Sequence, residues 1–114
     1  SGCTLDSRFG SDVTIPDNTK IAYNTVFTKT WEVTNNGTCD WGTGFFLKHV
    51  GGDRLSGPDS VPVPRVKAGE TVQLSANLRA PDKPGTYISK WQICVGADQC
   101  FGAKLFAQII AVAP

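Results

Sequence analysis

The sequence predicts an all-β fold, an antiparallel sandwich of about seven short strands. Three observations predict it: apolar and polar residues alternate in several segments, turn residues recur between these segments, and no amphipathic stretch is long enough for a helix. With 114 residues the chain is expected to form one domain over 1–114, in which 1–11 is an N-terminal arm.

The predicted strands follow one another along the chain. In the most regular one, alternate residues from Phe27 to Val33 share one face, and Lys29 interrupts their apolar row. The segment 58–64 carries several prolines and is predicted to be an edge strand or a long connection, because proline has no N–H to donate to a central ladder. The other predicted strands are 12–15, 45–50, 72–78, 86–95 and 101–112.

The four cysteines predict two disulfides. There is no Cys-x-x-Cys pair, and the one histidine, His49, lies far along the chain from Cys39, which argues against zinc or redox chemistry. Cys94 and Cys100 flank a short segment with Gly and Asp that suits a hairpin, so these two are expected to pair. Cys3 then pairs with Cys39 and ties down the arm. Disulfides predict an extracytoplasmic location, either secreted or at the cell surface.

Charge and hydropathy narrow the choice of partners. Lys and Arg number 11 against 10 Asp and Glu, the net charge is +1, and no basic stripe is present, so nucleic acid is not expected. No apolar run is long enough for a membrane span, so no direct membrane insertion is expected. The isolated domain is expected to be monomeric. An alternative for Cys3 is that Ser1-Gly2-Cys3 ends a lipoprotein signal and Cys3 is lipidated, which would leave Cys39 without a partner.

We predict no catalytic, cofactor or metal site. Gly-x-Ser-x-Gly is absent, and no nucleophile motif accompanies His49. Most carboxylates stand singly in turns, and the sequence has no Asp-x-Asp-x-Asp pattern for calcium. The glycine-rich segments 42–44 and 51–52 lack the lysine and the following helix of a nucleotide site.

The aromatic side chains are the main candidates for the core and for a binding surface. Residues on the inward rows are predicted to pack in the core. Trp41 either caps one end of that core or presents its ring to a sugar or a peptide, and the neighbouring Cys39 favours packing. The candidate binding surface is Trp41, Phe45 and His49, and the candidate core aromatics on the predicted strands are Phe27, Trp31, Tyr87 and Trp91.

Several motifs occur in an order that resembles a known family. They are Phe27, Lys29, Thr30 and Trp31, then Asn35, Gly37, Cys39 and Trp41, then Gly69 and Pro81, then Gly85, Tyr87 and Trp91, and finally Phe101-Gly102 before an apolar last strand. Together they resemble the four-tryptophan immunoglobulin-like (FW) domain of the next-to-breast-cancer-gene autophagy receptors. Similar domains occur in bacterial proteins, often extracellular ones. The resemblance runs from Asp12 to Val112.

The resemblance implies an immunoglobulin-like antiparallel β-sandwich. It adds Phe101 and Phe106 to the candidate core aromatics, with Phe106 in place of the fourth tryptophan. It also implies a noncatalytic binding module in a larger cell-surface or secreted protein, in a bacterial extracellular form. The expected partner is a protein or a glycan. The alternatives are a purely structural spacer and an accessory domain of an extracellular enzyme.

Overall fold

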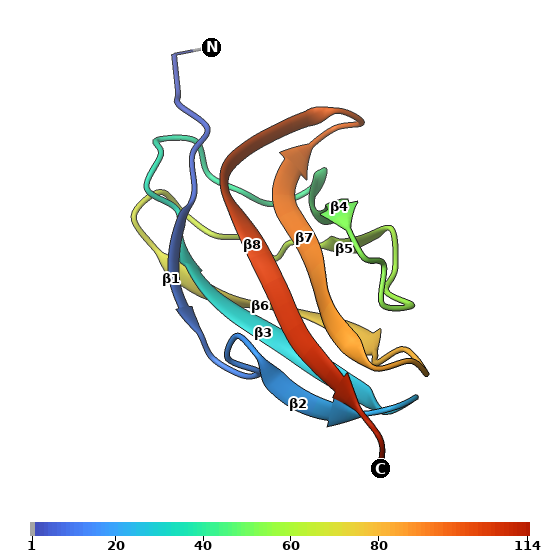
Figure 1. Ribbon diagram of the computed structural model, residues 1–114. Coiled ribbons are helices and arrows are strands. Elements are labelled where there is room, and N and C mark those ends of the chain that lie inside the picture. The colour runs from blue at the N-terminus through green and yellow to red at the C-terminus, as the bar shows by residue number, and fades with distance from the viewer. Residues whose placement is uncertain (1) are drawn as a thin grey trace.

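Two β-sheets packed face to face make up the computed structural model, which describes residues 2–114 (Figure 1). The prediction of an all-β sandwich is confirmed, and the described residues contain no helix that could cross a membrane. One sheet has three strands in the order β1 (Arg8–Asp12), β3 (Val26–Thr34) and β6 (Thr71–Arg79). The other has five, in the order β2 (Thr19–Ala22), β8 (Gln99–Val112), β7 (Gly85–Val95), β4 (Phe45–Gly52) and β5 (Ser60–Pro62).

The first two strands differ from the prediction. A strand was expected at 12–15, but β1 runs over Arg8–Asp12, and the residues after it turn toward Lys29. The four-residue strand β2 was not predicted, and it pairs parallel to β8, whereas the other strand pairs are antiparallel. A segment as short as Thr19–Ala22 has too few residues to show alternation, so only the neighbouring strand β8 reveals its pairing.

The core lies between the inward rows of β3 and β7. Trp31 and Trp91 are completely buried, and their rings pack with 6.3 Å between centroids. The indole N–H of Trp31 donates to the backbone carbonyl of Phe106 at 2.9 Å, so the large ring is buried without losing a hydrogen bond. Alternate residues of β6 pack against the same core.

The lysine in the inward row of β3 is also completely buried. Its Nζ lies 2.7 Å from Oδ1 of Asp12 and donates to the backbone carbonyls of Thr14 at 3.0 Å and Ile15 at 2.8 Å. The ammonium therefore has three acceptors, as many as it has protons, and burial leaves none of them unpaired. Lys29 fixes the segment after β1 against the middle of β3.

One candidate core aromatic lies at the surface. Phe106 is 42% exposed, so its assignment to the core is wrong. In β8 the buried positions Phe101, Leu105 and Ala107 are odd-numbered, and an even-numbered residue between them faces outward. Phe106 contributes only its carbonyl to the core, through Trp31. Among the other candidate core aromatics, Phe27, Trp31, Trp91 and Phe101 are buried and Tyr87 is half-buried.

The hairpin between β7 and β8 carries one of the two disulfides. Cys94 and Cys100 are directly opposite each other in the register of these strands, with 3.8 Å between their Cα atoms. Cys94 is buried and Cys100 is exposed. The second disulfide joins Cys3 to Cys39. This pairing differs from the alternative in which Cys3 is lipidated and Cys39 has no partner.

Candidate functional site

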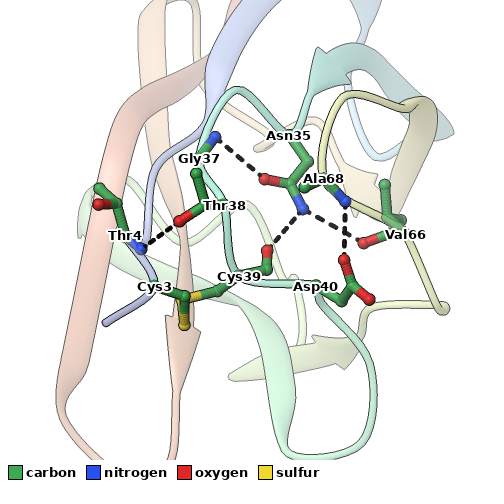
Figure 2. Close-up of a disulfide and its surroundings, with 9 residues drawn as sticks. All are labelled: Cys3, Thr4, Asn35, Gly37, Thr38, Cys39, Asp40, Val66 and Ala68. Carbon is green, nitrogen blue, oxygen red and sulfur yellow. Dashed lines mark hydrogen bonds between the residues drawn. A yellow bond between two sulfur atoms is a disulfide. The ribbon is translucent and has the colours of Figure 1, made fainter. Parts of the chain in front are cut away.

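The connection from β3 to β4 is held by one buried amide (Figure 2). Asn35 follows the last residue of β3 and is completely buried. Its Nδ2 donates to the carbonyls of Cys39 at 2.9 Å and Val66 at 3.2 Å, and its Oδ1 accepts from the N–H of Gly37 at 3.2 Å. These bonds replace the ladder that ends with β3, so the connection has a fixed shape although it contains little regular structure.

The N-terminal arm lies against the same connection (Figure 2). The Cys3–Cys39 disulfide joins the two segments, and the carbonyl of Thr4 accepts from the N–H groups of Thr38 at 2.9 Å and Cys39 at 3.1 Å. The N–H of Thr4 donates to Oγ1 of Thr38 at 2.7 Å. Gly37 permits this close approach, because a Cβ there would lie 2.3 Å from the Thr4 carbonyl oxygen.

A third segment, before β6, completes the framework. Trp41 and Val66 exchange two backbone hydrogen bonds of 2.8 and 3.1 Å. Oδ1 of Asp40 accepts from the N–H of Ala68 at 2.9 Å (Figure 2). The arm, the connection after β3 and the segment before β6 therefore form one cross-linked end of the sandwich. We call this end the loop end.

An open groove of about 640 Å³ lies at the loop end. One wall is the stretch from Asp40 to Phe46, and the other is formed by Pro62, Val63 and Arg65. Phe45 is half-buried and its ring meets that of Phe101 edge-on, with 6.0 Å between centroids. The groove thus combines aromatic and aliphatic walls with one acidic and one basic side chain, a composition suited to polypeptide or sugar ligands.

The candidate binding surface is only partly assembled by the structure. Trp41 lines the groove but is 1% exposed, so it packs in the core, the alternative that the neighbouring Cys39 favours, and it presents no open indole ring for stacking. Its ring packs against Phe101 with 6.1 Å between centroids. Within residues 2–114 its Nε1 has no hydrogen-bond partner. Phe45 also lines the groove.

His49 lies outside the groove. Its ring is half-buried and meets the Trp91 ring edge-on at 5.4 Å, and its Nε2 is 3.2 Å from the carbonyl oxygen of Asp53. Over the part of the chain that the structure describes, no three His, Cys, Asp or Glu side chains gather as a metal site would require. All four cysteines are in disulfides. The position of His49 is therefore set by its packing against Trp91 and its contact with the carbonyl of Asp53.

The candidate binding residues do not include the second wall of the groove. Pro62 and Val63 lie in the segment 58–64, predicted as an edge strand or a long connection, and Arg65 directly follows this segment. Phe46 was not singled out, although it adjoins Phe45 in the same predicted strand. The pairing of β4 with β5 brings Phe46 opposite Pro62, and no signal in a single sequence specifies that register.

Comparison with known protein families identifies this sandwich. The Ig-like domain from next to BRCA1 gene matches residues 14–111, from just after β1 almost to the end of β8. The chain belongs to this family. The Ig-like domain family accounts for the order of motifs from Phe27 to Phe101. Phe106, which the resemblance assigns to the position of the fourth tryptophan, faces solvent.

Curated relatives support the same assignment. The chain is 38% identical to Protein JOKA2 of Solanum tuberosum over 92% of its own length, and 36% identical to Protein ILRUN of Danio rerio over 87%. It is 33% identical to the Next to BRCA1 gene 1 protein of Homo sapiens over 87%. The chain spans only 13%, 35% and 10% of these three proteins. All three are eukaryotic and give no support to the expected bacterial origin.

Proposed function

We propose that this Ig-like domain is a noncatalytic binding module that holds a protein partner in the groove at the loop end. The supporting observation is the groove itself, which has aromatic walls and is built on a backbone fixed by a disulfide and by the buried amide of Asn35. A rigid groove costs less conformational entropy on binding than a mobile loop. A glycan is the other occupant that the aromatic walls and polar rim suit.

We also propose that the domain works in an oxidising, extracytoplasmic compartment. Two disulfides in a chain of 114 residues support this location, since cytosolic thiols are kept reduced. The Cys3–Cys39 bond shapes one end of the groove, so reduction would loosen the wall that begins at Asp40. Binding and oxidation are therefore linked in this proposal.

A panning experiment with a phage-displayed peptide library tests the proposal. The oxidised domain is immobilised, and enriched peptides are titrated into ¹⁵N-labelled domain. Shifts are expected at residues 40–46 and 62–65. Arg65→Glu should weaken binding about tenfold, because the exposed Arg65 lies on the rim and contributes no hydrogen bond or ion pair to the fold among the described residues.

Lys20→Glu is the matched control. Lys20 is exposed on β2, outside the groove, and its replacement makes the same change in net charge. It should leave the affinity unchanged. No enriched peptide, together with no binding on a glycan array, would refute the module, and shifts confined to another face would refute the groove.

A structural spacer is the second candidate, and the shape of the molecule favours it. The principal extents are 51, 25 and 17 Å, and the two ends of the described chain lie at opposite ends of the long direction (Figure 1). Such a domain separates whatever precedes it from whatever follows. The spacer predicts that Arg65→Glu and Lys20→Glu behave alike in every binding assay.

A further inference from the structure

The four outer strands of the two sheets differ in how they are protected from pairing with another chain. β5 has three residues and ends at Pro62, with Pro58 and Pro64 close by. β2 has four residues, and β1 has a bulge between Phe9 and Ser11. β6 has nine residues, no proline and no bulge in its pairing with β3. Short length, proline and bulges are the usual protections of an edge, and β6 has none of them.

The backbone of β6 offers a continuous set of hydrogen-bonding groups. The backbone N–H of Asn35 donates to the carbonyl of Glu70, the residue just before β6. Because the pairing continues without a bulge, the even-numbered residues of β6 bond to β3 in the same way. The N–H of the odd-numbered Arg79 points away from β3 and donates to the carbonyl of Leu55. The odd-numbered residues Thr71, Gln73, Ser75 and Asn77 therefore direct their N–H and C=O groups away from β3. These eight groups have no partner within residues 2–114.

The side chains along this edge carry no charge from Thr71 to Leu78. The odd-numbered ones are exposed on the outer face of the sheet and pair with β3: Ser75 with Thr30 at 2.7 Å and Asn77 with Thr28 at 2.8 Å. The edge is therefore free of bulges, polar and neutral. Lysines that would repel an approaching strand are absent from it.

We propose that β6 pairs with β6 of a second copy of this chain, antiparallel about a two-fold axis at Leu74. In this register Thr71 opposes Asn77 of the second copy, and Gln73 opposes Ser75. Every outward N–H and C=O of the four odd-numbered residues then has a partner, which gives eight inter-chain hydrogen bonds. Shifting the register by two residues in either direction leaves some of these groups unpaired.

The ends of the free edge match this register. Beyond Asn77 the edge is closed, because the next outward N–H, that of Arg79, is already bonded to Leu55. The residue of the second copy opposite Asn77 is Thr71, the first residue of β6. The second strand thus begins where the free edge stops. The two three-stranded sheets become one six-stranded sheet with an isologous interface.

The contact is small, and this sets its strength. Two strand edges bury less than the roughly 1,200 Å² of a stable interface, so the dimer should form at high local concentration. Copies held near one another by a longer chain or at a surface reach effective concentrations of about 1 mM. This inference departs from the expectation of a monomeric domain, which took no account of the sheet edges.

Two double variants test the proposal, because the proposed register places residue 73 opposite residue 75 of the second copy. In Q73K/S75E each new lysine faces a new glutamate of the second copy, and in Q73K/S75K four lysines face one another. Both variants lose the same Thr30–Ser75 hydrogen bond, so their folding stabilities serve as a matched control. Sedimentation equilibrium from roughly 20 µM to 1 mM should show dimerisation at least about tenfold tighter for Q73K/S75E than for the unmodified chain. Q73K/S75K should remain a single copy.

Each other result overturns the proposal. Monomers throughout for the unmodified chain and Q73K/S75E would show that the edge takes no second copy and is open to a strand of a different protein. Equal dimerisation of the two variants would place the contact elsewhere. The Arg65→Glu variant should dimerise like the unmodified chain, so failure of the groove proposal leaves this test intact.

Discussion

At the scale of single residues, two buried polar side chains set the positions of long segments. Lys29 joins the segment after β1 to β3, and Asn35 joins the connection after β3 to the segment before β6. Each is completely buried with hydrogen-bond partners for its polar atoms. Removing such a side chain leaves its partners buried and unpaired, which costs more than the bonds themselves contributed.

Lys29→Met should therefore lower the free energy of unfolding by about 3 kcal/mol. The thioether fills the same space, but the Asp12 carboxylate and the carbonyls of Thr14 and Ile15 lose their donor. Denaturant titration measures the change, with exposed Lys20→Met as the control. A loss below about 1 kcal/mol would mean that water replaces the ammonium.

Asn35→Ala should cost about 2–3 kcal/mol, since the carbonyl of Cys39 and the N–H of Gly37 lose their partner and the carbonyl of Val66 keeps only the N–H of Trp41. Asn36→Ala, at the exposed neighbour, should stay within about 0.5 kcal/mol of the unmodified chain. Amide hydrogen exchange at Gly37 and Cys39 should accelerate in the first variant alone. Equal stability of the two variants would contradict the role assigned to the amide.

Lys29 and Phe106 show what single residues in a sequence can and cannot reveal. Alternation placed Lys29 on the inward row, and the structure buries it, but its acceptors come from a segment whose path was not predictable. Phe106 was placed in the core by its resemblance to a motif position. Counting in steps of two from Phe101 would have put it on the outer face, where it lies.

At the scale of elements, the N-terminal arm depends on a bulge position in β8. Gly102 has φ of 74°, and a Cβ there would lie 2.1 Å from Oγ of Ser7. Ser7 accepts twice from the N–H of Ala103, through its carbonyl and its hydroxyl, at 3.1 Å each. The arm thus packs on β8 by a contact that only glycine permits.

The variants Gly102→Ala and Gly96→Ala distinguish the stability lost through a clash with Ser7 from the stability lost through backbone strain. Both glycines have positive φ, but a Cβ at Gly96 meets nothing within 4 Å. Gly96→Ala should cost about 1 kcal/mol from the left-handed conformation alone, and Gly102→Ala at least about 1 kcal/mol more. Thermal unfolding measures both, and exchange at Ala103 reports release of the arm. Equal losses would show that Ser7 simply moves aside.

The elements also differ in how far the sequence predicts them. β3 and β6 alternate over nine residues and β7 covers the predicted segment 86–95, and in β3 the buried row is the one that alternation predicts. β2 and β5 have four and three residues, so a neighbouring strand specifies them more than their own sequence does. The groove is equally hard to predict from the sequence, because β5 and the residues after it form one of its walls.

At the scale of the whole molecule, the two disulfides should differ in their effect on stability. Cys3 and Cys39 are 36 residues apart, and Cys94 and Cys100 are 6 apart. The loop-entropy relation gives about 4 kcal/mol for the long loop and about 2 kcal/mol for the short one. Unfolding of the two paired Cys→Ser variants measures this. A larger loss for the Cys94/Cys100 pair would mean that the hairpin bond acts by packing.

The Cys3–Cys39 bond also determines how the domain carries tension. A pull on the chain at Cys3 passes through the sulfur atoms straight to Cys39, so β1, β2 and β3 lie outside the loaded path. The 36-residue loop cannot be drawn out while the bond is intact, which withholds about 120 Å of contour length. With the disulfide intact, the domain extends little under tension. A thiol reductant would break the disulfide and allow the loop to extend.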